Sequence, residues 1–295
     1  MLTELMEGLE NINKHFQPSG LSLLSIAVAN EALECVKILL KAGADPNQWD
    51  LSEKITALHT VAQTGLKTDR PAYTCQLLDL LVKHGGNINN GIEKNGGSVL
   101  HCGVSKRNYP MVKYLLDHKV KTVCKTFHET ALHTAVELDD YTMAELLLEA
   151  NRGCANSLMN DTRRLSPLHL AAEAGHTETC KVLLNFGADI LLLTADKMTA
   201  LHLAARNLNL EVVKQLLEVR VRQDTNLINA RDNQGRTALS LCSSSQLKSS
   251  QGAIDCMIAL INLKADLDAQ DDVGNTPLHN AATGESHHNF QFIIQ

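Results

Sequence analysis

The chain has 295 residues, of which 44% are hydrophobic and only 3% aromatic, and its formal net charge at pH 7 is −6. This length is large for a single core, so two globular domains or one long repeat array are the natural architectures. The acidic balance argues against nucleic acid as a partner, because a surface that binds nucleic acid is normally basic.

Residues 1–19 place apolar side chains at helical spacing. We expect a capping helix or the remnant of a preceding repeat in this stretch. It is acidic and lacks the basic region of a secretory signal peptide. No apolar run in the chain approaches the ~18 residues that a membrane-spanning helix needs, so we expect no membrane insertion by this segment.

A short phrase recurs along residues 20–295. Its leucines are separated by 32 to 42 residues, which predicts about eight irregular repeats. The copies are TALHTV from Thr56, SVLHCG from Ser98, TALHTA from Thr130, SPLHLA from Ser166, TALHLA from Thr199, TALSLC from Thr237, TPLHNA from Thr276 and a weaker SLLSIA from Ser22.

Each phrase predicts a short helix, followed by a second helix and a turn. The Thr or Ser suits the N-cap, and Pro167 and Pro277 suit the first helical position. A Leu-rich helix follows and ends at a glycine in three repeats, Gly43, Gly85 and Gly187. Turn-forming sequences such as DPN and DNQG then predict a hairpin finger.

This pattern resembles the ankyrin repeat over residues 20–295. The resemblance implies an all-α repeat fold, an ankyrin α-solenoid with β-hairpin fingers, whose function is to bind proteins. The glycine before the Thr is kept at Gly96, Gly235 and Gly274, and fingers that lack it are expected to be less regular. Residues 64–73 and 243–252 are insertions between helices, and the second, Ser-rich insertion is expected to be a mobile loop.

A second resemblance is weaker. The irregular repeats, the inserted AQTGLKTDRPAYTCQLLDLL segment and an end at Gln295, inside an expected helix, are similar to the cytoplasmic ankyrin region of insect TRPA-type cation channels, the painless and pyrexia group. Three interpretations therefore stay open: a cytoplasmic scaffold or adaptor, the cytoplasmic ankyrin domain of a larger channel of which this chain is a fragment, and repeats that precede an enzyme domain.

The residues themselves indicate no chemistry. There is no Walker loop, GxSxG or HExxH motif, so we expect no enzyme and no cofactor here. The eight cysteines fit no zinc spacing and favour a reducing, cytoplasmic setting. Only Cys124 has the neighbouring positive charge that a reactive thiol needs. Six histidines hold the fixed repeat position and are expected to form structural hydrogen bonds, not a metal site: His59, His101, His133, His169, His202 and His279.

The family resemblance places protein partners at the finger tips and on the concave face of the first helices. Carried onto this sequence, the tip residues are Lys94, Asn95, Phe127, Arg163, Leu165, Met198, Gln234 and Arg236, and the helix residues are Lys106, Glu137, Glu173 and Arg206. Phe127, Leu165 and Met198 are apolar and are candidate anchors for a partner. The alternative is that these three side chains fold against the next finger. Asn47 and Asn89 resemble substrates of an asparaginyl hydroxylase, or are plain turn residues.

Overall fold

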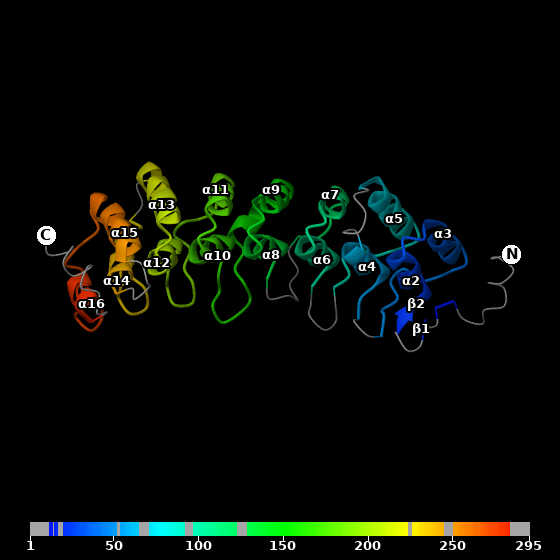
Figure 1. Ribbon diagram of the computed structural model, residues 1–295, viewed down its shortest axis with the longest axis horizontal. Helices are drawn as coiled ribbons and strands as arrows, with labels where there is room; N and C mark the ends of the chain where they lie inside the picture. Colours follow the sequence, from blue (N-terminus) through cyan, green and yellow to red (C-terminus); the bar gives the residue numbers. More distant parts are fainter. Residues whose placement is uncertain are drawn as a thin grey trace. The chain divides into compact units, whose positions relative to one another are not determined.

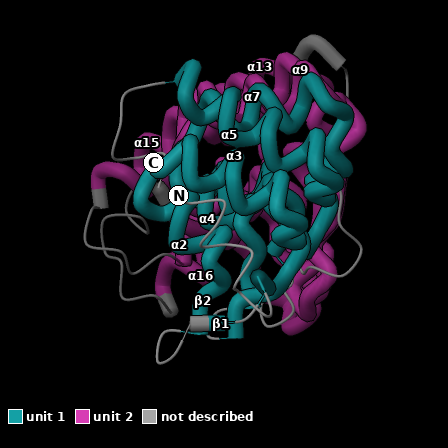
Figure 2. The backbone as a smooth tube through the Cα atoms, turned by 90° about the vertical axis from the view of Figure 1, so that its right-hand side faces the viewer, with its two compact units in different colours: residues 1–134 teal, residues 135–295 magenta. Residues whose placement is uncertain are grey.

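Pairs of short helices make up the computed structural model (Figure 1). The structure describes residues 12–13, 15–16, 20–51, 54–64, 71–91, 97–122, 129–223, 226–244 and 250–283. The chain divides into two compact units, residues 1–134 and 135–295 (Figure 2). The central residues of both expected insertions, 65–70 and 245–249, and the helical pattern expected before Ile12 lie outside the described residues.

The first unit opens with two short strands and continues with helix pairs. Strand β1 (His15–Phe16) lies antiparallel to β2 (Leu21–Ser22), with His15 opposite Ser22. In each pair the first helix packs on the second, and the first helices also pack on one another, α2 on α4 and α4 on α6. The pairs are α2 (Leu23–Ala29) with α3 (Leu33–Lys41), α4 (Ala57–Thr64) with α5 (Pro71–Lys83), and α6 (Val99–Ser105) with α7 (Tyr109–Asp117).

The second unit repeats this arrangement. Its first helices form one row, α10 on α12, α12 on α14 and α14 on α16, and its second helices form another, α9, α11, α13 and α15. The boundary between the units falls within α8. The elements are α8 (Ala131–Glu137), α9 (Tyr141–Ala150), the 3₁₀ helix η1 (Arg152–Asn156), α10 (Pro167–Ala174), α11 (Thr177–Asn185), α12 (Ala200–Arg206), α13 (Leu210–Gln223), α14 (Ala238–Ser243), α15 (Ser250–Asn262) and α16 (Pro277–Thr283). The all-α repeat fold expected from the sequence is confirmed.

Helix α10 shows why the recurring phrase folds this way. The Ser166 hydroxyl accepts a hydrogen bond from the His169 backbone N–H at 3.3 Å, and the His169 Nδ1 accepts one from the Ser166 N–H at 3.1 Å. This reciprocal capping satisfies two backbone donors that a helix start leaves without partners. Leu168 and the small residues Ala171 and Ala172 are buried, so the neighbouring first helices approach closely.

The helix-ending glycines have the backbone conformation that the sequence predicts. Gly43, Gly85 and Gly187 have φ values of 92°, 93° and 86°. This left-handed region is open to glycine at no steric cost, and Lys119 and Lys264 adopt it at the equivalent place in other repeats.

The fingers are tight turns with little strand character. Among the described residues outside β1 and β2, the one isolated β-bridge joins Gly91 and Ser98. A typical finger is closed by the hydrogen bond from the Asp232 N–H to the Arg236 carbonyl, 3.0 Å long. Such a turn is too short to carry a ladder of strand hydrogen bonds, so the expected β-hairpin is reduced to its turn.

Fingers without the turn glycine differ less than expected. Lys197 has a φ of 56°, close to the φ of 73° at Gly235. Its finger is closed by the equivalent hydrogen bond, from the Thr194 N–H to the Met198 carbonyl. The expectation of an irregular finger is therefore wrong here, because a lysine tolerates the left-handed conformation that glycine normally supplies. The finger that contains Arg164 is longer and closes from Met159 to Leu165.

Candidate functional site

Several residues selected from the sequence fall outside the described part of the chain or stand alone in it. Lys94, Asn95 and Phe127 lie outside the described residues, as does Cys124. Lys106, just after α6, and Glu137, at the end of α8, are exposed on the two units. Their contribution to binding stays a prediction.

Leu165 and Met198 are buried, so the structure corrects their selection as exposed anchors. Their side chains are only 2% and 6% exposed and pack in one cluster with Leu203. The closing hydrogen bonds Met159 N–H to Leu165 O and Thr194 N–H to Met198 O explain this position. Both residues lie at the base of a finger, where the chain enters the next helix, so their side chains join the core.

Other apolar side chains are exposed on fingers of the second unit. Leu191 and Leu193, in the finger between α11 and α12, are about half exposed, and Val273 is 85% exposed. Sequence reasoning placed Val273 at a finger tip and missed Leu191 and Leu193. The signal for these two leucines was the run ILLLT at residues 190–194, which is more apolar than a solvated turn requires.

Glu173 holds together a finger and two helices of the second unit. Its Oε2 lies 2.6 Å from Arg163 Nη2, and its Oε1 lies 2.8 Å from Arg206 Nη2. Arg163 comes from the finger before α10, Glu173 from the end of α10 and Arg206 from the end of α12. We call these three residues the arginine bridge. Its carboxylate is 24% exposed, but Arg163 and Arg206 remain 52% and 41% exposed.

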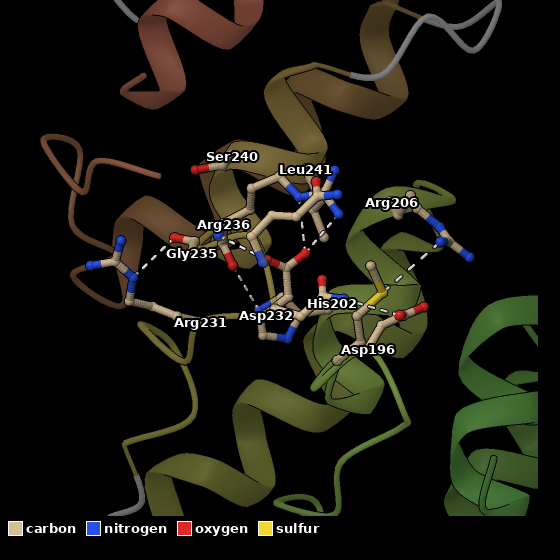
Figure 3. A network of polar contacts seen from close by, with 12 residues as sticks. Asp196, His202, Arg206, Arg231, Asp232, Gly235, Arg236, Ser240 and Leu241 are labelled. Atoms are coloured by element: carbon tan, nitrogen blue, oxygen red, sulfur yellow. Dashed lines mark hydrogen bonds and ion pairs between the residues drawn. The ribbon is translucent and has the colours of Figure 1, made fainter. Parts of the chain in front are cut away.

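A second acidic group organises the next finger (Figure 3). The Asp232 side chain is fully buried and receives Nε and Nη2 of Arg236 at 2.9 and 2.7 Å. Its other oxygen accepts the backbone N–H groups of Gln234 and Arg236, both at 2.9 Å. Arg236 is thereby committed to the turn, whereas Gln234 is exposed at the tip. The sequence marked Arg236 as a contact for partners and did not single out Asp232.

Backbone hydrogen bonds join neighbouring fingers of the second unit. The Ala195 N–H donates to the Arg163 carbonyl at 3.0 Å, and the Asn233 N–H donates to the Asp196 carbonyl at 2.9 Å. A third bond runs from the Asp272 N–H to the Gln234 carbonyl at 3.0 Å. The four fingers joined in this way, which we call the finger row, are therefore fixed to one another and present Arg163 and Gln234 in set positions.

The repeat histidines have the structural role expected from the sequence. The Nε2 of His169 lies 3.0 Å from the Leu192 carbonyl, and that of His202 lies 3.0 Å from the Ala230 carbonyl. Both bonds connect a first helix to the finger that follows. Burial lowers the pKa of His169 to about 4, so its ring is neutral at pH 7 and accepts the capping bond through Nδ1.

The described ranges contain neither a metal-binding cluster nor a membrane-spanning helix. No three His, Cys, Asp or Glu side chains gather there in a way that could hold a metal ion. No helix among these residues is long and apolar enough to cross a membrane.

Comparisons with known proteins agree with this geometry. A model of the family described as ankyrin repeats (3 copies) matches residues 24–126, 69–160, 118–194 and 168–271. The chain is 34% identical to inversin of Canis lupus familiaris over 161 residues, covering 53% of this chain and 14% of inversin.

Two further relatives are of different kinds. The transient receptor potential channel pyrexia of Drosophila melanogaster is 33% identical over 117 residues, covering 39% of this chain and 11% of the channel. The L-asparaginase of Dirofilaria immitis is 32% identical over 145 residues, covering 48% of this chain and 24% of the enzyme. In all three relatives the match covers less than a quarter of their length.

Proposed function

The chain belongs to the ankyrin-repeat family, and on that premise we propose that it is a non-catalytic protein-binding module, a scaffold or adaptor. Residues 20–295 would act as the binding array, with a protein partner on the finger row and the ends of the first helices. The observation that supports this most is the arginine bridge. It holds Arg163 and Arg206 in fixed positions while both side chains remain about half exposed.

Fixed, exposed arginines suit a binding surface for two physical reasons. Arginine is enriched among the residues that dominate binding energy, because its planar group makes several directed hydrogen bonds. A side chain that is already held in place also loses less conformational freedom when a partner arrives. Leu191, Leu193 and Val273 would supply apolar contact elsewhere on the finger row. The partner is therefore expected to bring a carboxylate together with apolar side chains.

Capture experiments with matched variants test this proposal. Immobilised wild-type chain is compared with a double variant, Arg163→Gln and Arg206→Gln, and with the control Lys181→Gln. Lys181 is an exposed cation on α11, in the row of second helices. Proteins bound by wild type and by the control but lost from the double variant support the proposed surface. Equal capture by all three chains contradicts it.

The similarity to pyrexia supports a second candidate function. In that case the module would be the cytoplasmic ankyrin domain of a larger cation channel, coupled to a pore that lies outside this chain. An immunoblot of cytosolic and membrane fractions with an antibody to residues 20–295 distinguishes the two. A band near 32.2 kDa in the cytosol supports the adaptor, and a much larger band in the membrane fraction supports the channel.

The similarity to an L-asparaginase does not lead us to propose an enzyme. The match covers 24% of that enzyme. Ankyrin repeats occupy residues 24–271 of this chain, so the similarity is one between repeats. We propose no cofactor and no nucleic-acid partner, in keeping with the net charge of −6.

A further inference from the structure

Helices α14 and α15, the helix pair of one repeat, pack on one another and each carries a cysteine (Figure 1). Cys242 lies near the end of α14 and Cys256 in the second turn of α15, and both are fully buried free thiols. The Cys242 Sγ donates to the Ala253 carbonyl at 3.3 Å. Ala253 lies three residues before Cys256, on the same face of α15, so the Cys242 sulfur is directed at the turn that carries Cys256.

The preceding repeats show what the two thiols replace. Counted from the start of the recurring phrase, Cys242 stands where Ala171 and Ala204 stand in α10 and α12. Counted back from the residue that ends the second helix, Cys256 stands where Thr179 stands in α11. In this repeat, therefore, cysteines stand at two positions where the preceding repeats carry small residues, one on each helix of the pair.

The two sulfurs also differ in acidity. The interaction between the two thiols lowers the pKa of Cys256, and nearby Lys214 lowers it further against the opposing effects of burial and Asp255. The same interaction, together with burial, raises the pKa of Cys242. Cys256 is thus the thiol that ionises first, and Cys242 is placed to react with the Cys256 sulfur once that sulfur has been oxidised.

We propose that Cys242 and Cys256 form a dithiol site that hydrogen peroxide oxidises to an intrachain disulfide, which links α14 to α15. The Cys256 thiolate attacks one peroxide oxygen, the O–O bond breaks, and the leaving hydroxide takes up a proton to become water. Cys256 is then a sulfenic acid. The Cys242 sulfur attacks the Cys256 sulfur, its proton leaves with the displaced hydroxide as a second water, and the S–S bond forms. Two thiols are oxidised and one peroxide is reduced.

Two other thiols, Cys102 and Cys180, serve as internal controls. Burial raises the pKa of Cys102 to about 11 and that of Cys180 to about 12, so neither has the thiolate character that peroxide requires. Peroxide is little larger than water and reaches buried sulfur through the local openings that packed helices undergo. Peroxide is therefore expected to oxidise the Cys242–Cys256 pair in preference to Cys102 and Cys180, because Cys242 and Cys256 lie on packed helices and Cys256 has the lowered pKa.

Peptide mapping of the folded wild-type protein tests the proposal. Peroxide is raised until the exposed Cys35 is oxidised, the remaining thiols are alkylated in denaturant, and the digest is analysed by mass spectrometry. The expected result is a cross-linked peptide that joins Cys242 to Cys256, that disappears on reduction with dithiothreitol, and that accompanies alkylated Cys102 and Cys180.

Two variants and one condition sharpen the result. Cys180→Ser should leave the cross-linked peptide unchanged, and Cys256→Ser should abolish it and leave Cys242 as a thiol. Recovery of both Cys242 and Cys256 as alkylated thiols, after Cys35 has been oxidised, overturns the proposal. So does a cross-link that appears only when the chain is oxidised in urea, because it would then reflect chance pairing in the unfolded state.

Discussion

The side-chain oxygen of Asn47 accepts a hydrogen bond from the backbone N–H of Asn87 at 2.7 Å, across 40 positions of sequence. The Asn47 amide group also donates to the Gly85 carbonyl at 2.8 Å. Asn156 makes the same two bonds in the second unit, with the Asp189 N–H and the Gly187 carbonyl. An asparagine that follows one second helix therefore fixes the turn at the end of the next.

Replacing this asparagine should weaken the stack. Asn47→Ala removes both bonds, which are exposed and can be replaced by water, so we expect a loss of about 0.5–1.5 kcal/mol in the free energy of unfolding. Asn47→Asp keeps the acceptor and loses the donor, and should cost less. Urea titration of the three proteins measures the difference. Equal stability of wild type and Asn47→Ala would show that the bond contributes nothing.

Stability should fall as the solution becomes mildly acidic. Burial lowers the pKa of His59 and His169 from 6.5 to about 4 in the folded chain. Between these values the unfolded chain binds more protons than the folded chain, so the free energy of unfolding decreases as pH falls, by on the order of 3 kcal/mol for each histidine. Urea titrations from pH 7 to pH 4.5 follow the loss.

The variant His169→Gln isolates the contribution of one ring. It should be less stable than wild type at pH 7, because the capping bond is disturbed, and its stability should depend less steeply on pH below 6.5. A slope identical to that of wild type would contradict the assignment of a neutral, buried His169.

Finger lysines in the left-handed conformation offer a stabilising change. Lys197 has φ 56°, so Lys197→Gly should raise the free energy of unfolding by up to about 1 kcal/mol, as the penalty for a side chain in this region is removed. The matched change Lys181→Gly, inside α11, should lower it by a similar amount. Thermal unfolding of both variants decides whether the turn is strained as described.

The buried carboxylate of Asp232 should matter more than an exposed one on the neighbouring finger. Asp232→Ala removes bonds to Arg236 and to two backbone N–H groups, so we expect a loss of about 2–3 kcal/mol. Asp196, which is exposed and bonds Asn233 at 3.1 Å, provides the comparison: Asp196→Ala should cost less than about 1 kcal/mol. Similar losses in the two variants would mean that burial of Asp232 is not what gives it importance.

Sequence reasoning found the repeats because their signals are local. A Ser or Thr cap, a histidine three positions later and a glycine with positive φ all act within one repeat, and Ser166, His169 and Gly187 behave as their types require. The sequence also identified Arg163, Glu173 and Arg206 as surface residues. It could not show that they form one ion bridge, because the bridge depends on how two repeats pack.

The errors in the candidate site have the same physical origin. Whether Leu165 and Met198 point outward depends on where each finger closes, and the closing bond ends at these residues themselves. The base of a finger and its tip are only two positions apart in the sequence. Amino-acid composition does not determine at which of these positions the finger closes. The pairing of Cys242 with Cys256 was likewise invisible, because fourteen positions separate them and an insertion lies between.

The most direct test of the proposed binding surface is hydrogen–deuterium exchange of the chain with and without a partner obtained by capture. Protection on binding is predicted for the finger row, around residues 160–165, 194–198 and 231–236, and at the ends of α10 and α12. Protection confined to the second helices α9, α11 and α13, with the finger row unchanged, would contradict the proposal that the arginine bridge marks where a partner binds.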